Sequence, residues 1–119
     1  MNDTKLSLVV IRAADLERSA RFYAWLGLEF TKHSHGSGPE HYICELEGLV
    51  FEIYPRQTEL DSTAATRIGF QIERLDATID QLEQQGTSIV SPPKDSPWGK
   101  RAVVTDPDGH RVELTERPV

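Results

Sequence analysis

Apolar and polar side chains alternate in short runs through the first half of the chain, which is the pattern of half-buried β-strands. Leu16, Ala20 and Tyr23 then recur at helical spacing after the first run. Asp15 is a good helix N-cap, and Gly27 is well placed to end the helix. The pattern therefore predicts a βαβββ unit, with strands over residues 6–11, 28–35, 41–46 and 50–54.

The same order of elements returns after residues 56–65, which are polar and show no periodicity. Leu75, Ile79 and Leu82 form a second helical stripe that stops at Gly86. The sequence Asp-Pro-Asp-Gly at residues 106–109 is a strong turn signal. We expect strands over residues 67–72, 87–90, 100–105 and 111–115, with a proline-rich loop at residues 91–99.

The two halves can be superimposed on each other along the sequence. Leu16 and Leu75 are 59 positions apart, and Glu52 and Glu113 are 61 apart, so the second copy carries about two extra loop residues. This predicts an internal duplication and an α+β fold of two tandem βαβββ modules. We expect one domain over residues 1–119, with module 1 at 5–55, a linker at 56–65 and module 2 at 66–117. Each sheet has one face under its helix, so the two free faces are expected to form a curved trough.

Composition narrows the possible partners. A chain of 119 residues is the size of one ordinary domain. Net charge −6 and a pI of about 5.1 argue against a nucleic-acid partner, because such binding needs clustered Lys and Arg. We find neither a membrane-spanning apolar run nor a secretory leader, so we expect a cytoplasmic protein without a membrane partner. The lone Cys44 is expected to be a small buried hydrophobe.

Two stretches of the chain carry a family resemblance. The opening Val-Ile-Arg-Ala-Ala-Asp-Leu-Glu-Arg-Ser at residues 10–19 and the ending around residues 106–114 resemble the vicinal oxygen chelate superfamily, which includes glyoxalase I, bleomycin-resistance proteins and extradiol dioxygenases. The resemblance covers essentially the whole chain. It implies the paired-module fold and, as in many small members, a homodimer, but it leaves the activity open because this fold hosts several chemistries.

The resemblance also indicates where a metal is held in metal-dependent members, by ligands from the first and last strands of each module. Glu52 and Glu113 match the last-strand ligands, but the first-strand positions hold Leu8 and Arg67. Leu8 has no donor atom, and the Arg67 guanidinium is always cationic. We therefore expect no metal or other cofactor at these positions.

Arg67 has two interpretations. It can replace the metal electrostatically by bridging to Glu52, to Glu113 or to both. Alternatively, it lies at a strand end in solvent and the two glutamates are ordinary polar-face residues.

Strand alternation gives further candidates for the trough. In module 1 it places His33, His35, His41 and Glu45 on the face opposite the helix, together with Glu52 and Tyr54. One alternative is a divalent-metal site at His35, His41 and Glu52; another is substrate binding or acid–base chemistry by His35 or His41.

In module 2, Gln71 shares the face of Arg67, and Arg111 shares the face of Glu113. His110 points the other way and is left out of the site. Trp98, in the proline-rich loop, either caps the trough and stacks on a ligand or packs at a dimer seam.

Three functions remain open from the sequence. The first is metal-independent binding of a small organic molecule, in the manner of bleomycin-resistance proteins. The second is a divergent lyase, isomerase or dioxygenase-related enzyme that uses Glu52 or Glu113 as base, assisted by His41 or Tyr54. The third is a partner-binding module without a small ligand.

Overall fold

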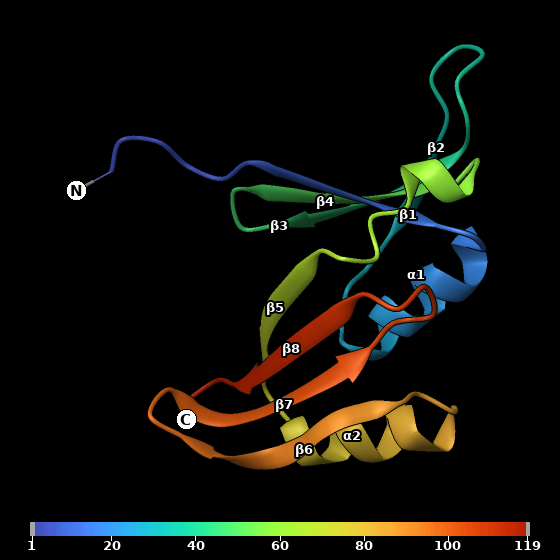
Figure 1. The fold of residues 1–119 in the computed structure, drawn as a ribbon. Helices are drawn as coiled ribbons and strands as arrows, with labels where there is room; N and C mark the ends of the chain where they lie inside the picture. The colour runs from blue at the N-terminus through green and yellow to red at the C-terminus, as the bar shows by residue number, and fades with distance from the viewer. Residues whose placement is uncertain (1, 119) are drawn as a thin grey trace.

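The computed structural model describes residues 2–118 and shows two βαβββ modules joined by a short linker (Figure 1). In the first module the order is β1 (Leu8–Ala13), α1 (Leu16–Trp25), β2 (Thr31–His33), β3 (His41–Leu46) and β4 (Leu49–Pro55). In the second it is β5 (Arg67–Ile72), α2 (Leu75–Gln84), β6 (Ile89–Ser96), β7 (Gly99–Thr105) and β8 (Arg111–Glu116). The duplicated α+β fold expected from the sequence is confirmed.

Each module builds its own four-stranded mixed sheet, in the orders β1-β4-β3-β2 and β5-β8-β7-β6. The first and last strands of each module are parallel, and the other neighbours are antiparallel. Figure 1 shows the first sheet at the top of the view, the second below it, and α2 running along β6. The glutamate strands β4 and β8 are central in their sheets, beside β1 and β5.

The helices begin and end largely where the sequence indicates. The Asp15 side chain accepts a hydrogen bond from the Arg18 amide, which caps α1, whereas the N-cap of α2 is Arg74, which makes no side-chain cap. Gly27 follows α1 with a φ of +102°, a conformation that glycine adopts at no steric cost.

Three local expectations differ from the structure. Within the expected strand at 28–35, only residues 31–33 pair, with β3. The linker contains a short 3-10 helix, η1 (Glu59–Asp61), which Thr58 and Asp61 cap reciprocally. The expected proline loop is largely strand, because β6 is an edge strand with register shifts around Pro92 and Pro93, where a missing amide donor is tolerated.

One hydrophobic core is shared by both modules. The Phe51 ring on β4 lies 5.8 Å, centroid to centroid, from the Phe70 ring on β5, and Tyr23 of α1 contacts both rings. Cys44 is buried in the same core, as expected. Phe51 and Phe70 lie on the helix-facing sides of their sheets, so the two sheets turn these sides toward a common centre.

A buried polar network also joins the modules. His110, at the start of β8, is fully buried, and its Nδ1 lies 2.8 Å from Asp106 Oδ2. The Tyr23 hydroxyl donates a hydrogen bond to the same oxygen, Asp106 Oδ2, at 2.7 Å. His110 Nε2 lies 2.7 Å from the Thr63 hydroxyl oxygen, which also accepts the Arg12 amide at 2.9 Å. The second-module turn is therefore tied to the first helix, the first strand and the linker.

Candidate functional site

Alternation along β8 and its neighbouring edge strand β5 brings a set of polar residues onto the helix-free face of the second sheet. On β8 these are Arg111, Glu113 and Thr115, and on β5 they are Arg67, Gly69 and Gln71. Glu113 pairs with Gly69 across the parallel β5–β8 ladder and with Val103 across the antiparallel β7–β8 ladder. Arg101, two residues before Val103, therefore emerges on the same face.

Glu113 binds two guanidinium groups with one oxygen. Its Oε1 accepts from Nη2 of Arg101 at 2.5 Å and from Nη2 of Arg67 at 3.0 Å. The hydrogen bond from Arg101, and then the one from Arg67, hold the pKa of Glu113 below its ordinary value against an opposing effect of burial. A carboxylate held ionised by two cations is a poor proton acceptor near neutral pH. This geometry therefore favours a role for Glu113 in positioning Arg67 and Arg101 over a role as general base.

Arg101 was not among the candidates from the sequence, although a signal for it exists. Counting back from the turn at residues 106–109 places residues 101, 103 and 105 on the face of Glu113, because paired residues of an antiparallel ladder share a face. Arg101 is thus the residue that completes the cluster.

A hollow of about 620 Å³ lies beside this cluster. Its lining includes the predicted residues Gln71, Trp98 and Glu113, together with Arg101 and Thr115. Trp98 is at the tip of the β6–β7 hairpin with 78% of its surface exposed. The hollow therefore combines an exposed aromatic ring with a charged floor.

The helix-free face of the first sheet presents a different chemistry. Glu52 and Tyr54 on β4 lie on the face opposite the buried Phe51 and Ile53, and Val10 pairs with Glu52. Glu45, which pairs with Val50, is exposed on the same face. Within residues 2–118, Glu52 makes no ion pair and no side-chain hydrogen bond, so its lone pairs stay available.

Three imidazoles and one phenol form a column at the end of this face. Tyr54 stacks on His41 with ring centroids 4.2 Å apart and an angle of 7° between the rings. His35 lies 5.2 Å from His41, and His33 lies 6.1 Å from His35. The Arg12 guanidinium also lies over the Tyr54 ring, 5.4 Å from the ring centroid.

His41 differs from the open trough residue expected from the sequence, because only 1% of its surface is exposed. Its Nδ1 lies 3.2 Å from the Pro39 carbonyl oxygen, while Nε2 is buried without a partner among the described residues. The alternative metal site at His35, His41 and Glu52 does not form, since no group of three or more His, Cys, Asp or Glu side chains in residues 2–118 is placed to hold a metal ion.

The positions that the family resemblance assigns to metal ligands do not suit a divalent ion here. Leu8 offers only an exposed aliphatic side chain. Arg67 brings a positive charge that is already bonded to Glu113. Two of the four positions thus lack a donor, and a third has its oxygen engaged by arginines.

The two helix-free faces are not joined within one chain. The ion pairs of Arg67 and Glu113 stay inside the second module, so the Arg67–Glu52 bridge considered from the sequence is absent among residues 2–118. The physical reason is the shared core: the sheets turn their opposite faces, through Phe51 and Phe70, toward each other.

These features define a class of protein: a duplicated βαβββ domain with helix-free sheet faces that carry polar clusters. The family model described as Glyoxalase/Bleomycin resistance protein/Dioxygenase superfamily matches residues 5–114. The chain belongs to this superfamily.

Similar proteins agree with the fold. An uncharacterized protein of Mycolicibacterium smegmatis is 26% identical over 110 residues, which cover 92% of this chain and 91% of that protein. TnmS3, an antibiotic binding protein from Streptomyces sp. CB03234, is 19% identical with a TM-score of 0.76 over 99% of both chains. The fosfomycin resistance protein FosX from Listeria monocytogenes is 20% identical with a TM-score of 0.72, over 98% of this chain and 95% of that one. No helix in residues 2–118 is long and apolar enough to cross a membrane.

Proposed function

We propose that this protein binds a small organic molecule against the second-sheet face, without the metal centre of other superfamily members. The observation that carries the proposal is the bonding of Glu113 to both Arg67 and Arg101, which fills the place of a metal with fixed positive charge. The antibiotic-binding TnmS3 has the same fold, which supports a small-molecule ligand for this chain.

The charge and shape of this face indicate what the ligand carries. Arg67, Arg101 and Arg111 contribute three positive charges against the single carboxylate of Glu113. Trp98 adds an exposed aromatic surface beside them. A planar molecule with an anionic or oxygen-rich group satisfies both features, because guanidinium groups bind oxyanions and indole stacks on flat rings.

The test uses anthraquinone-2-carboxylate as an anionic planar probe and bleomycin as a cationic one. Both are titrated into metal-free protein while the NMR signal of the Trp98 indole is followed. We expect the anthraquinone to bind and Arg101→Gln to weaken it about tenfold or more, as for loss of a hydrogen bond to a charged group. Lys32→Gln, which removes a positive charge from β2 in the first module, is the control. Retention of a stoichiometric divalent ion by Glu52 and Glu113, or binding that needs such an ion, would overturn the proposal.

We further propose that the ligand site is completed in a homodimer. In a single chain, a ligand on the Arg101–Glu113 face is covered on one side only. The helix-free face of the first sheet does not point toward this face, so it cannot cover the ligand's other side. The first-sheet face includes the exposed apolar residues Leu8 and Val10 on β1. A second copy that covers these residues supplies the other wall of the trough.

Glu52 supports a second candidate function, that of a lyase or isomerase. Unlike Glu113, Glu52 has no cation on its carboxylate in the described chain, so it retains the free lone pairs that a general base requires. This enzymatic alternative predicts that Glu52→Gln abolishes turnover of a glyoxalase-type substrate while the thermal stability is kept. Unchanged turnover in that variant removes Glu52 from the mechanism.

A further inference from the structure

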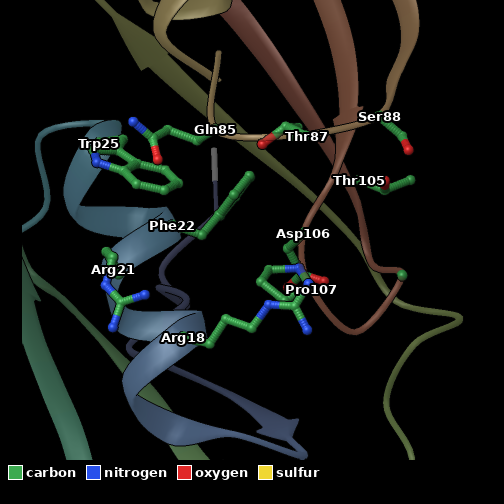
Figure 2. Close-up of a pocket in the computed structure, with 12 residues that line it drawn as sticks. Arg18, Arg21, Phe22, Trp25, Gln85, Thr87, Ser88, Thr105, Asp106 and Pro107 are labelled. Carbon is green, nitrogen blue, oxygen red and sulfur yellow. The ribbon is translucent and has the colours of Figure 1, made fainter. Parts of the chain in front are cut away.

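A second cavity lies on the helix side of the molecule, apart from both helix-free sheet faces. It has a volume of about 410 Å³, which is within the range of small-molecule sites. Helix α1 forms one wall, and the turns at residues 85–88 and 105–107 form the other (Figure 2). The cavity therefore sits where the first helix meets the second module.

The α1 wall is a stripe of two cations and two aromatic residues. Arg18, Arg21, Phe22 and Trp25 are spaced at i, i+3, i+4 and i+7, which places them on one helix face. Figure 2 shows Arg18 extending toward Pro107 and Trp25 lying near Gln85 of the opposite turn. Phe22 is buried beneath them, whereas Trp25 keeps part of its ring accessible.

The positive charge in this cavity is not neutralised by the lining. The side chains of Arg18 and Arg21 form no ion pair or hydrogen bond in the part of the chain that the structure describes. The carboxylate in the lining is Asp106, which is buried and already accepts from Tyr23 and His110. The chain as a whole has a net charge of −6. The two guanidinium groups therefore give this cavity a positive charge, opposite in sign to that of the whole chain.

We propose that this cavity binds a small aromatic anion, such as a ring bearing a carboxylate or sulfonate. The acid group binds at Arg18, which donates charge-assisted hydrogen bonds, and Arg21 on the same cavity wall adds a second positive charge. The ring packs on the Trp25 indole, and the Thr87 and Ser88 hydroxyls are in reach of further oxygens on the ligand. This site shares no residue with the hollow at Arg101 and Trp98, so it stands independently of the function proposed above.

The experiment uses 1-naphthoate as the probe and two-dimensional NMR as the readout. The chain has two tryptophans, so the Trp98→Phe variant assigns the indole signal of Trp25. We expect 1-naphthoate to shift the Trp25 signal saturably, and the neutral 1-naphthamide to leave it unchanged. Arg18→Gln with Arg21→Gln should weaken 1-naphthoate binding about tenfold or more.

The matched control removes the same charge elsewhere, with Lys5→Gln and Lys94→Gln together, and should keep the affinity. Arg101→Gln should also leave unchanged the 1-naphthoate affinity read from the Trp25 signal. This result would distinguish binding in this cavity from binding in the hollow at Arg101 and Trp98. An equal response to 1-naphthamide, an unchanged affinity in the Arg18 and Arg21 double variant, or a perturbation confined to Trp98 would overturn the proposal.

Discussion

At the scale of single residues, the role of a carboxylate is decided by what surrounds it. Glu52 and Glu113 occupy equivalent positions in the duplicated modules, yet Glu113 is bonded to two arginines and Glu52 to none among residues 2–118. A third carboxylate, Asp106, serves the fold. Burial alone raises the pKa of Asp106, but hydrogen bonds from His110 and Tyr23 outweigh it and leave the pKa lowered.

Replacing Asp106 should therefore cost stability in a pH-dependent way. We expect Asp106→Asn to lower the free energy of unfolding by roughly 2–4 kcal/mol at pH 7, because His110 and Tyr23 lose a buried charged acceptor. A lowered pKa in the folded state stabilises the fold above the unfolded-state value and is lost as pH falls through the folded value. The difference between wild type and variant should thus be constant near neutrality and shrink below about pH 4.

Urea denaturation at a series of pH values from 7 to 3 measures this difference. Asp95→Asn, at an exposed position of β6, is the control and should change stability little at any pH. A difference that grows on acidification would contradict the assigned ionisation of Asp106.

At the scale of elements, the two helices are capped unequally. Asp15 caps α1 with its side chain, whereas Arg74 at the start of α2 offers no acceptor and places a positive charge at the positive end of the helix dipole. Glu116 compensates in part, because its Oε2 accepts the Leu75 amide at 3.1 Å.

We expect Arg74→Ser to stabilise the protein by about 0.5–1 kcal/mol, since a serine oxygen caps the free amides of the first turn. Thermal unfolding followed by circular dichroism measures the change. Arg74→Ala, which removes the charge without adding an acceptor, is the matched variant and should gain less. Equal melting temperatures for the serine and alanine variants would show that capping contributes nothing at this position.

At the scale of the whole molecule, the chain is more open than a compact domain of its length. Its radius of gyration is 14.8 Å, against roughly 13.5 Å expected for about 120 residues. The apolar side chains Leu8 and Val10 are 52% and 37% exposed on the first-sheet face. Both features are consistent with the homodimer proposed above.

Analytical ultracentrifugation tests the dimer. We expect the wild-type chain to sediment as a dimer and the double variant Leu8→Glu and Val10→Glu as a folded monomer, because charges in an apolar contact are costly to desolvate. Leu60→Glu is the control: Leu60 is 98% exposed on the linker helix η1, and its replacement should leave the dimer intact. A monomeric wild type, or a dimer that tolerates both β1 charges, would rule out this interface.

Much of the fold followed from local sequence signals. The stripe of Leu75, Ile79 and Leu82, the cap at Asp15 and the turn glycines fixed both helices, because these signals act over one or two helical turns. Sequence patterns predicted the edge strands less well. The strand expected at 28–35 covers only residues 31–33, and Pro92 and Pro93 lie within the edge strand β6 instead of a loop. Edge strands have fewer neighbours to enforce a pattern, so sequence alone decides them poorly.

The sequence by itself determined the duplication and the face on which most strand residues point, and its resemblance to the superfamily indicated that Leu8 and Arg67 replace two metal ligands. Only the tertiary structure decided that Arg101 joins Arg67 on Glu113, that Tyr54 covers His41, and that His110 connects the modules. Alternation is a property of neighbouring residues along one strand and is readable from sequence. Contacts across strands and modules depend on register and on how the shared core around Phe51 and Phe70 orients the two sheets, which no local pattern specifies.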